Sequence, residues 1–401
     1  MGYKTVRMSA FINAKTAHKK LQFGTDKCYV LHIRNTHDTY KPLDLYVDSW
    51  KLKEVENINA FTKETEETYE GEHEINVSDV EKYLGQIISS DSTNTKNIDQ
   101  MYNRGIGIKN KILTILNTFT AGKYHFEVAI ILRNAYLISS ILYGSEVWYG
   151  ITEAEILKLE KVDNLLLRQL FECSSNVPTE LLFLELGILR LRDIVTMRRV
   201  MYLHHILKQP SNSLIFRFFI SQLKNPKKGD WVSQVLSDMV IINLNMEIED
   251  VAKMSKNAFK TLLKQKVNMY AFNQLIEIKN ERKSVNAKGK MINYDSFKMQ
   301  NYLLPSDRIS ILEQKWVFKC RTDDIDIKGN NRWKYEDISC VSCQLHPETQ
   351  KHLIECHTLL GKNEKMTYIP TYADIFKNDV NEQSYIARIM KENFHIREKY
   401  L

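Results

Sequence analysis

The spacing of hydrophobic positions changes along the chain near residue 91. Before that point, alternating β-branched and aromatic residues predict strands at 27–33, 43–50 and 82–89, after a helix at 8–20. Beyond it, apolar residues recur with the 3.6-residue period of amphipathic helices. We therefore expect a mainly α chain that begins with a small α/β part.

The helical part contains recognisable helix boundaries. Thr152, followed three residues later by Glu155, forms a capping box at the start of one helix, and Gly187 ends another that begins at Pro178. Residues 283–300 are polar and predict a linker. The helices expected from the periodicity cover residues 101–119, 126–143, 151–173, 178–187, 190–208, 213–223, 231–244, 255–282 and 309–321.

These elements divide the chain into five parts. An α/β part with an acidic insertion covers 1–91, a helical region covers 92–210, and a helical basic region with a linker covers 211–305. A helix and a cysteine–histidine cluster occupy 306–361, and a tail follows at 362–401. Three strands and one helix bury too little surface to be stable alone, so we expect residues 1–91 to be the edge of a larger domain.

Charge is unevenly distributed along the chain. Of the 401 residues, 43% are hydrophobic and 26% are charged, which excludes global disorder, and the net charge is +7. Glu54–Glu81 contains ten acidic residues and one lysine, a balance of −9, and we expect an exposed loop or insertion there. Lys256–Lys290 contains nine basic residues and two glutamates, a balance of +7. This basic stretch predicts a docking site for a phosphate backbone, with a solvated helix face as the alternative.

Cysteine usage and hydropathy indicate an intracellular protein. Three of the six cysteines fall in one short window, which is typical of a reduced protein with one metal site rather than of a disulfide scaffold. The first residues lack the apolar core of a signal peptide. The most apolar stretch, 128–144, is interrupted by Arg133 and Asn134 and is too short to span a bilayer. We expect a nuclear or cytoplasmic location and no membrane partner.

A metal-binding pattern lies near the end of the sequence. Cys340, Cys343, His352 and Cys356 follow the spacing C-x2-C-x8-H-x3-C. The first pair can bind one ion from a tight turn, and the second pair lies one helical turn apart. Three sulfurs and one nitrogen form a closed tetrahedral set, which predicts a structural zinc site.

Two alternatives to this ligand set stay open. The four residues could form a partly buried cluster of reduced cysteines without a metal. His346 or His357 could replace a ligand, although we expect both on the surface. In the four-residue set no coordination position is left for water, so zinc-assisted hydrolysis is not expected.

Four segments of the sequence resemble one protein family. They are HKKLQFGTDKCYVLHI (18–33), KYLGQIIS (82–89), LRNAYLISSILYGSEVWYG (132–150) and PTELLFLELGILRLRDIVTMRRVMYLHHIL (178–207). In this order, and together with the cysteine–histidine cluster, they resemble the C-terminal part of the reverse transcriptases of non-LTR (LINE-type) retrotransposons, over nearly the whole chain. The resemblance implies the end of a polymerase palm, a helical thumb that holds the template–primer duplex, and a zinc knuckle. It also implies RNA, DNA or both as partners.

The resemblance suggests roles for individual residues. Lys27 matches a palm lysine that assists proton transfer to the leaving pyrophosphate, with an exposed lysine at a strand start as the alternative. Tyr83, Leu84 and Gly85 match the strand that holds the primer end, although Tyr83 and Leu84 could equally serve packing. The thumb-type basic residues, which could neutralise backbone phosphates or merely solvate helices, are Lys109, Lys111, Arg198 and Arg199.

The residues that catalyse polymerisation have no match. In the family, catalytic aspartates hold two magnesium ions and precede the segment at 18–33, just before which this chain begins. Asp323 and Asp324 follow the thumb-like region and predict a surface turn. We therefore expect the C-terminal fragment of such a polymerase, inactive alone and dependent on magnesium only if the missing upstream part of the polyprotein is supplied. The alternatives are a non-catalytic nucleic-acid-binding module and a helical interaction protein held together by zinc.

Overall fold

The structure of the chain is a computed structural model. It describes residues 29–31, 46–57, 62–74, 76–83, 85–90, 93–118, 122–227, 229–281, 292–362, 368 and 370–400. The chain divides into two compact units, Met1–Asn97 and Ile98–Leu401. Within the described residues the fold is mainly helical, as the sequence predicts.

The described residues of the first unit form three pairs of strands. β1 (Tyr29–Leu31) runs parallel to β4 (Asn76–Ser78), β2 (Tyr46–Asn57) runs antiparallel to β3 (Thr62–Glu74), and β5 (Val80–Tyr83) runs antiparallel to β6 (Gln86–Ser89). The strands expected at 27–33 and 43–50 are present as β1 and β2. The helix expected at 8–20 lies outside the described residues.

The acidic stretch forms a long hairpin, so the loop expected there is wrong, while an insertion stays a prediction. Residues of β2 pair with residues of β3 along the whole of both strands. Threonine and tyrosine positions among the glutamates favour a strand, and the register places Lys53 opposite Glu66 and Glu56 opposite Lys63. A count of charges along the sequence does not reveal this pairing.

The single strand expected at 82–89 is in fact a hairpin. Tyr83 of β5 pairs with Gln86 of β6, and Gly85 lies in the turn with a φ of 86°. Glycine adopts this positive φ without a steric cost. Asn97, near the start of α2 (Thr95–Thr118), fixes the hairpin. Its Oδ1 accepts the Ile87 amide at 3.0 Å and its Nδ2 donates to Gln86 Oε1 at 2.6 Å.

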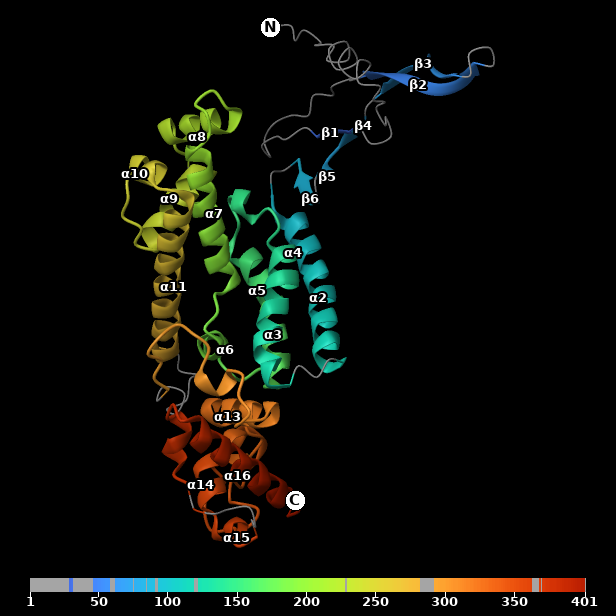
Figure 1. The fold of residues 1–401 in the computed structure, drawn as a ribbon. Helices are drawn as coiled ribbons and strands as arrows, with labels where there is room; N and C mark the ends of the chain where they lie inside the picture. The colour runs from blue at the N-terminus through green and yellow to red at the C-terminus, as the bar shows by residue number, and fades with distance from the viewer. Residues whose placement is uncertain are drawn as a thin grey trace. The chain divides into compact units, whose positions relative to one another are not determined.

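The second unit is built of helices (Figure 1). Its α-helices and one π-helix follow α2 in the order α3 (His125–Leu132), the π-helix η3 (Arg133–Ile138), α4 (Ser139–Ile141), α5 (Glu153–Phe171), α6 (Thr179–Leu186), α7 (Leu191–Leu207), α8 (Leu214–Lys224), α9 (Trp231–Ile241), α10 (Ile248–Lys253), α11 (Lys256–Glu281), α13 (Ile311–Thr322), α14 (Gln350–Glu355), α15 (His357–Leu360) and α16 (Val380–Glu398). Short 3-10 helices are η2 (Gly122–Tyr124), η4 (Ser145–Val147), η5 (Asn301–Leu303), η6 (Lys328–Asn330), η7 (Arg332–Lys334) and η8 (Tyr372–Phe376). Figure 1 shows α7 and α11 side by side, which their contacts confirm.

A leucine-rich core holds α5 and α6 in place. The expected capping box is present at the start of α5, where Thr152 N donates to Glu155 Oε2 at 2.9 Å and Glu155 N donates to Thr152 Oγ1 at 3.2 Å. α6 ends at Gly187, whose φ is 61°, and a Cβ there would lie 2.1 Å from the Lys298 carbonyl carbon. Only glycine therefore allows the later segment to pack this closely. The apolar stripe expected on α5 is fully buried and consists of Ile156, Leu159, Val162, Leu166 and Leu170.

The linker predicted at 283–300 is wrong for residues 292–300, which pack against the core, while residues 283–291 lie outside the described residues. Tyr294 OH and Tyr302 OH donate to the buried carboxylate of Glu185 at 2.8 and 2.9 Å. Arg321 Nε donates to the same carboxylate at 2.9 Å. A buried carboxylate is costly unless it is paired and hydrogen-bonded, and these three donors satisfy it. The cluster joins α6 to α13 through a segment that is mostly polar in sequence.

The most apolar helical region includes a π-helical segment. Arg133 begins this segment and is 1% exposed. Its Nε and Nη2 donate to Asp163 at 2.7 and 2.5 Å, and Nη2 also donates to Leu189 O at 2.9 Å. The arginine that interrupts the apolar run is thus paired inside the core. Among the described residues, no helix is long and apolar enough to cross a membrane.

The last helices gather at one end of the second unit (Figure 1). α16 packs against α13 and α14, and Asn393 Nδ2 donates to Leu353 O at 2.8 Å. Ile386, Ile389 and Met390 of α16 are buried. The segment predicted as a tail therefore contributes a core helix, which supports the loop and helix that carry the cysteine–histidine cluster.

Candidate metal centre

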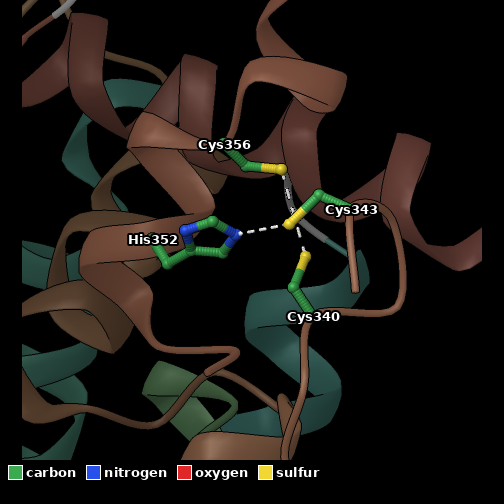
Figure 2. Close-up of side chains that lie close together, drawn as sticks. All are labelled: Cys340, Cys343, His352 and Cys356. Carbon is green, nitrogen blue, oxygen red and sulfur yellow. Dashed lines mark hydrogen bonds between the residues drawn. The ribbon is translucent and has the colours of Figure 1, made fainter. Parts of the chain in front are cut away.

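Four side chains converge between the loop before α14 and the start of α15. Figure 2 shows the three thiols and the imidazole of Cys340, Cys343, His352 and Cys356 pointing toward one another. One ligand atom from each lies within 4.8 Å of all the others. Cys340 Sγ is 4.0 Å from Cys356 Sγ, and Cys343 Sγ is 3.3 Å from His352 Nε2. Tetrahedral zinc with bonds of about 2.3 Å to sulfur and 2.0–2.1 Å to nitrogen requires separations of about 3.8 and 3.6 Å. The geometry therefore fits a metal ion.

Backbone hydrogen bonds shape the loop that carries the first two cysteines. Cys340 N donates to His346 O at 2.8 Å and Gln344 N donates to Cys340 O at 2.8 Å. Gln344 has a φ of 57°, which closes the turn tightly. Thr349 then caps α14, because its Oγ1 accepts His352 N at 3.1 Å. The cap places the histidine on the first turn of the helix.

The surroundings of the ligands favour metal-binding protonation states. Burial, together with the charge of His346, lowers the pKa of His352, so its imidazole is neutral and can donate an electron pair. Burial raises the pKa of Cys340 to about 11. Burial also raises the pKa of Cys343, but the backbone N–H groups of Leu345 and His346 donate to its sulfur and lower it overall. Binding of an ion would therefore release the proton of Cys340.

The loop is anchored to the rest of the unit by a buried ion pair. Arg397 Nε donates to Glu348 Oε1 at 2.9 Å and Arg397 Nη2 donates to Glu348 Oε2 at 2.8 Å. The Lys328 amide donates to Glu348 Oε2 at 2.8 Å, and the Gly329 amide donates to Glu348 O at 2.9 Å. A Cβ at Gly329 would lie 2.1 Å from that oxygen. The cluster is thus part of a folded module rather than an isolated finger.

The two alternative histidines lie outside the cluster. His346 and His357 are exposed, as the sequence predicts, and neither belongs to the group of convergent ligand atoms among the described residues. The ring of His346 lies 5.4 Å from the ring of His352, centroid to centroid. The four-residue set with three sulfurs and one nitrogen is the arrangement that the structure supports.

Arg198 and Arg199, predicted to contact phosphates, do not form a basic surface. Arg199 is 4% exposed, and its Nε donates to Asp238 at 2.6 Å while Nη1 donates to Trp148 O at 3.1 Å. Arg198 Nη1 donates to Leu142 O, and burial lowers the pKa of its guanidinium. Both side chains connect α7 to neighbouring elements. The phosphate role predicted for Arg199 is therefore corrected, because a buried guanidinium paired with a carboxylate does not meet a backbone phosphate. Arg198 is half-buried and is engaged by Leu142 O, which disfavours the same role for it.

Lys109 and Lys111 of α2 differ from each other. Lys109 is 8% exposed and its Nζ donates to Gln169 Oε1 at 2.8 Å, so it holds α2 against α5. Lys111 is exposed and remains available to a ligand.

Of the predicted primer-strand residues, Tyr83 is 64% exposed and Gly85 forms the turn. Lys27 and Leu84 lie outside the described residues.

The two consecutive aspartates have structural partners. Asp323 ends α13 with a φ of 59°. Asp324 Oδ2 accepts the Ser174 amide at 2.9 Å, and its Oδ1 accepts the Ser174 hydroxyl. Asp324 thus ties the end of α13 to the loop after α5, which agrees with a turn rather than with a metal-binding pair.

One basic surface was visible in the sequence only as a charge excess. Lys256, Lys260 and Lys264 are spaced four residues apart on α11 and are exposed; we call them the lysine row. In the part of the chain that the structure describes, none of them has an ion-pair partner. The spacing of four residues in a helix is the signal that could have identified them.

No protein-family model, no curated protein and no solved structure matches this chain.

Proposed function

We propose that this chain binds RNA, DNA or both without catalysing a reaction, as the C-terminal part of a non-LTR retrotransposon reverse transcriptase. Its helices would correspond to the thumb, and its last module would be a zinc knuckle. The order of the four resembling segments supports the family. The surface of α11 supports nucleic-acid binding.

The lysine row is the observation that carries the proposal. Residues four apart in a helix are about 6 Å apart along its axis and share one face, so the three ammonium groups lie in a line. No acidic residue occurs between Lys256 and Ile276. On α10, which precedes α11, Asp250 is engaged by Lys253 at 3.0 Å. A line of cations without facing carboxylates favours a phosphate backbone.

Zinc would act in this proposal as a structural ion. Three cysteines and one histidine form the closed set typical of structural zinc, and softer thiolate ligands disfavour magnesium or calcium. The ion would join the loop at Cys340 to the helices that begin at Gln350 and His357. The resulting module would hold α13 and α16 in a fixed arrangement.

Equilibrium binding of the zinc-loaded chain tests the proposal. Fluorescence anisotropy would measure affinity for single-stranded RNA, single-stranded DNA and duplex DNA over a range of salt concentrations. Replacing all three residues of the lysine row by alanine should weaken binding and lower the slope of log K against log salt by about 2 for single strands. A matched triple variant, Lys161→Ala, Lys298→Ala and Lys399→Ala, removes equal charge from exposed sites elsewhere and should bind as the parent does. Equal losses in both variants, or no binding by the parent, would reject the proposal.

An exposed apolar face on α8 favours a second candidate, a helical interaction protein stapled by zinc. Leu214 and Phe218 lie one turn apart and are 70% and 61% exposed. Large apolar side chains at such spacing are typical of a helix that packs against another protein. The same titrations separate the candidates, since a protein-binding helix predicts no salt-dependent affinity for nucleic acid.

A further inference from the structure

A cavity lies between the end of α9 and the middle of α11. Its volume is about 300 Å³, which is the lower end of the range for small-molecule sites. Three consecutive residues after Val240 form one wall, and two turns of α11 form the other. The lining residues are Ile241, Ile242, Asn243, Lys266, Met269, Tyr270, Asn273 and Gln274.

The wall contributed by α9 is rigid. Asn243 adopts a φ of 53°, and its amide donates to Val240 O at 3.0 Å. Leu244 N donates to Met239 O at 2.9 Å, which completes the turn that ends the helix. Ile242 and Leu244 are buried in the core on either side of Asn243. These contacts fix the backbone of this wall, while the side chains of Ile241 and Asn243 stay exposed.

Polar groups in the cavity are available to a ligand. Among the described residues, the side-chain amides of Asn243 and Asn273 have no hydrogen-bond partner, and Lys266 has no ion pair. Gln274 is partly engaged, since its Nε2 donates to Glu277 at 3.0 Å. Burial raises the pKa of Tyr270, so its phenol is neutral. No carboxylate lines the cavity.

This combination suits a nucleobase with its phosphate. Amides offer a donor and an acceptor together, which is what the hydrogen-bonding edge of a base requires. The ring of Tyr270 and the side chains of Met269 and Ile241 supply apolar and aromatic surface for the face of a base. Lys266 can neutralise an adjacent phosphate. A base presents both its edge and its face only when it is unpaired.

The cavity and the lysine row lie on two sides of the same exposed strip of α11. Residues 257, 261, 265, 269 and 273 form that strip and are all exposed. The lysine row borders it on one side, and residues 266, 270 and 274 border it on the other. Lys264 and Tyr270 are about 9 Å apart along the helix axis. Around the axis they are about 240° apart on the side of the strip, because each residue turns the helix by about 100°. A single strand that reaches both must therefore wrap around the exposed side of α11 rather than run along it.

We infer that the cavity holds one unpaired nucleotide of a strand whose neighbouring phosphates lie along the lysine row. This inference rests on the proposed nucleic-acid-binding function and adds a base-reading site to it. The lysine row contributes salt-dependent affinity that is independent of the bases. Within the cavity, the ring of Tyr270 and the side-chain amides contribute affinity that requires a base and depends little on salt.

The test uses the zinc-loaded full chain and two 12-nucleotide DNA probes. One is oligothymidine, and the other has the same backbone with abasic sites throughout. Tyr270→Leu removes the ring and should weaken binding of oligothymidine roughly 5- to 150-fold, the range of one stacked base. Asn273→Ala, at an exposed position that does not threaten folding, should weaken it roughly 5-fold. Both variants should bind the abasic probe as the parent does and keep the parent's salt slope.

Photo-crosslinking gives a second measurement on the same complex. A probe with 5-iodouracil should crosslink to the peptide that contains Met269 and Tyr270. Unchanged oligothymidine affinity in both variants, or crosslinks confined to other peptides, would overturn the inference while leaving the lysine row intact as a binding surface. If the parent binds neither probe, the proposed function itself fails, which is a different result.

Discussion

Arg397 of the last helix and Glu348 of the metal-binding loop form a bidentate ion pair, and their side chains are 4% and 0% exposed. The pair joins elements that are 49 residues apart in sequence. The ion pair fixes the metal-binding loop to α16, which gives this short loop a support that its own few residues do not provide. The cysteine–histidine cluster therefore depends on a helix that lies beyond its own sequence motif.

Replacing Arg397 by alanine should destabilise the module strongly. The change leaves the Glu348 carboxylate buried and unpaired, which costs about 3–5 kcal/mol. Urea denaturation followed by circular dichroism would measure the free energy of unfolding. Arg388→Ala is the matched control on the same helix. Arg388 also pairs with a glutamate, Glu313, but its side chain is 54% exposed. That exposed pair should contribute no more than about 1 kcal/mol, so equal losses in both variants would contradict the role given to Arg397.

The same pair predicts a dependence of stability on pH. Burial raises the pKa of Glu348, but hydrogen bonds from Arg397 and the Lys328 amide outweigh it and lower the pKa overall. A carboxyl group with a lowered folded pKa stabilises the fold above its unfolded pKa, near 4.5, and loses this contribution as the pH falls through the folded value. Unfolding free energies measured between pH 3 and pH 6, about the unfolded pKa of glutamate, should therefore decrease toward acid. Glu348→Gln should show a shallower decrease, and an identical slope in both proteins would remove Glu348 from this account.

Metal removal should unfold the end of the second unit and leave its middle folded. One zinc ion per chain is expected, and X-ray absorption should show three sulfurs at about 2.3 Å and one nitrogen at about 2.0–2.1 Å. Chelation, or Cys343→Ser, should increase hydrogen exchange in residues 338–360 and in α16, while α5 and α7 stay protected. Cys173→Ser is the control, since Cys173 lies outside the cluster and should leave the zinc content unchanged. Stoichiometric zinc in the Cys343 variant would show that the ligand set is wrong.

The sequence predicted those features that depend on residues close together in the chain, namely the ligand cluster and most of the helices. The ligands follow from spacing alone, since Cys340 and Cys343 share a turn and His352 and Cys356 share a helical turn. Most helices were predicted from the 3.6-residue spacing of apolar residues and from capping residues at their ends. The errors concern residues whose partners are distant in sequence. Arg199 seemed to belong to a basic face because nothing near it in sequence indicates Asp238, 39 residues away.

The same reason explains the segments that were misjudged. Residues 292–300 looked like a linker because Glu185, the acceptor for Tyr294, precedes it by 109 residues. The acidic stretch looked like a loop because the backbone pairing of β2 with β3 does not follow from a count of charges. At Arg199 and Tyr294, a charged or polar group was counted as exposed before its partner was known. Burial of paired charges is the quantity that a one-dimensional pattern does not contain.

Arg199 should matter for stability and not for nucleic-acid binding. Arg199→Ala leaves Asp238 buried without its partner and should lower the free energy of unfolding by about 3–5 kcal/mol. The paired change Arg199→Met with Asp238→Leu removes both charges, keeps similar volumes, and should restore much of the stability. This double variant isolates the role of the guanidinium in a folded protein. Its affinity for single strands and its salt slope should equal those of the parent, whereas a slope reduced by about 0.7 would return Arg199 to the phosphate-binding surface.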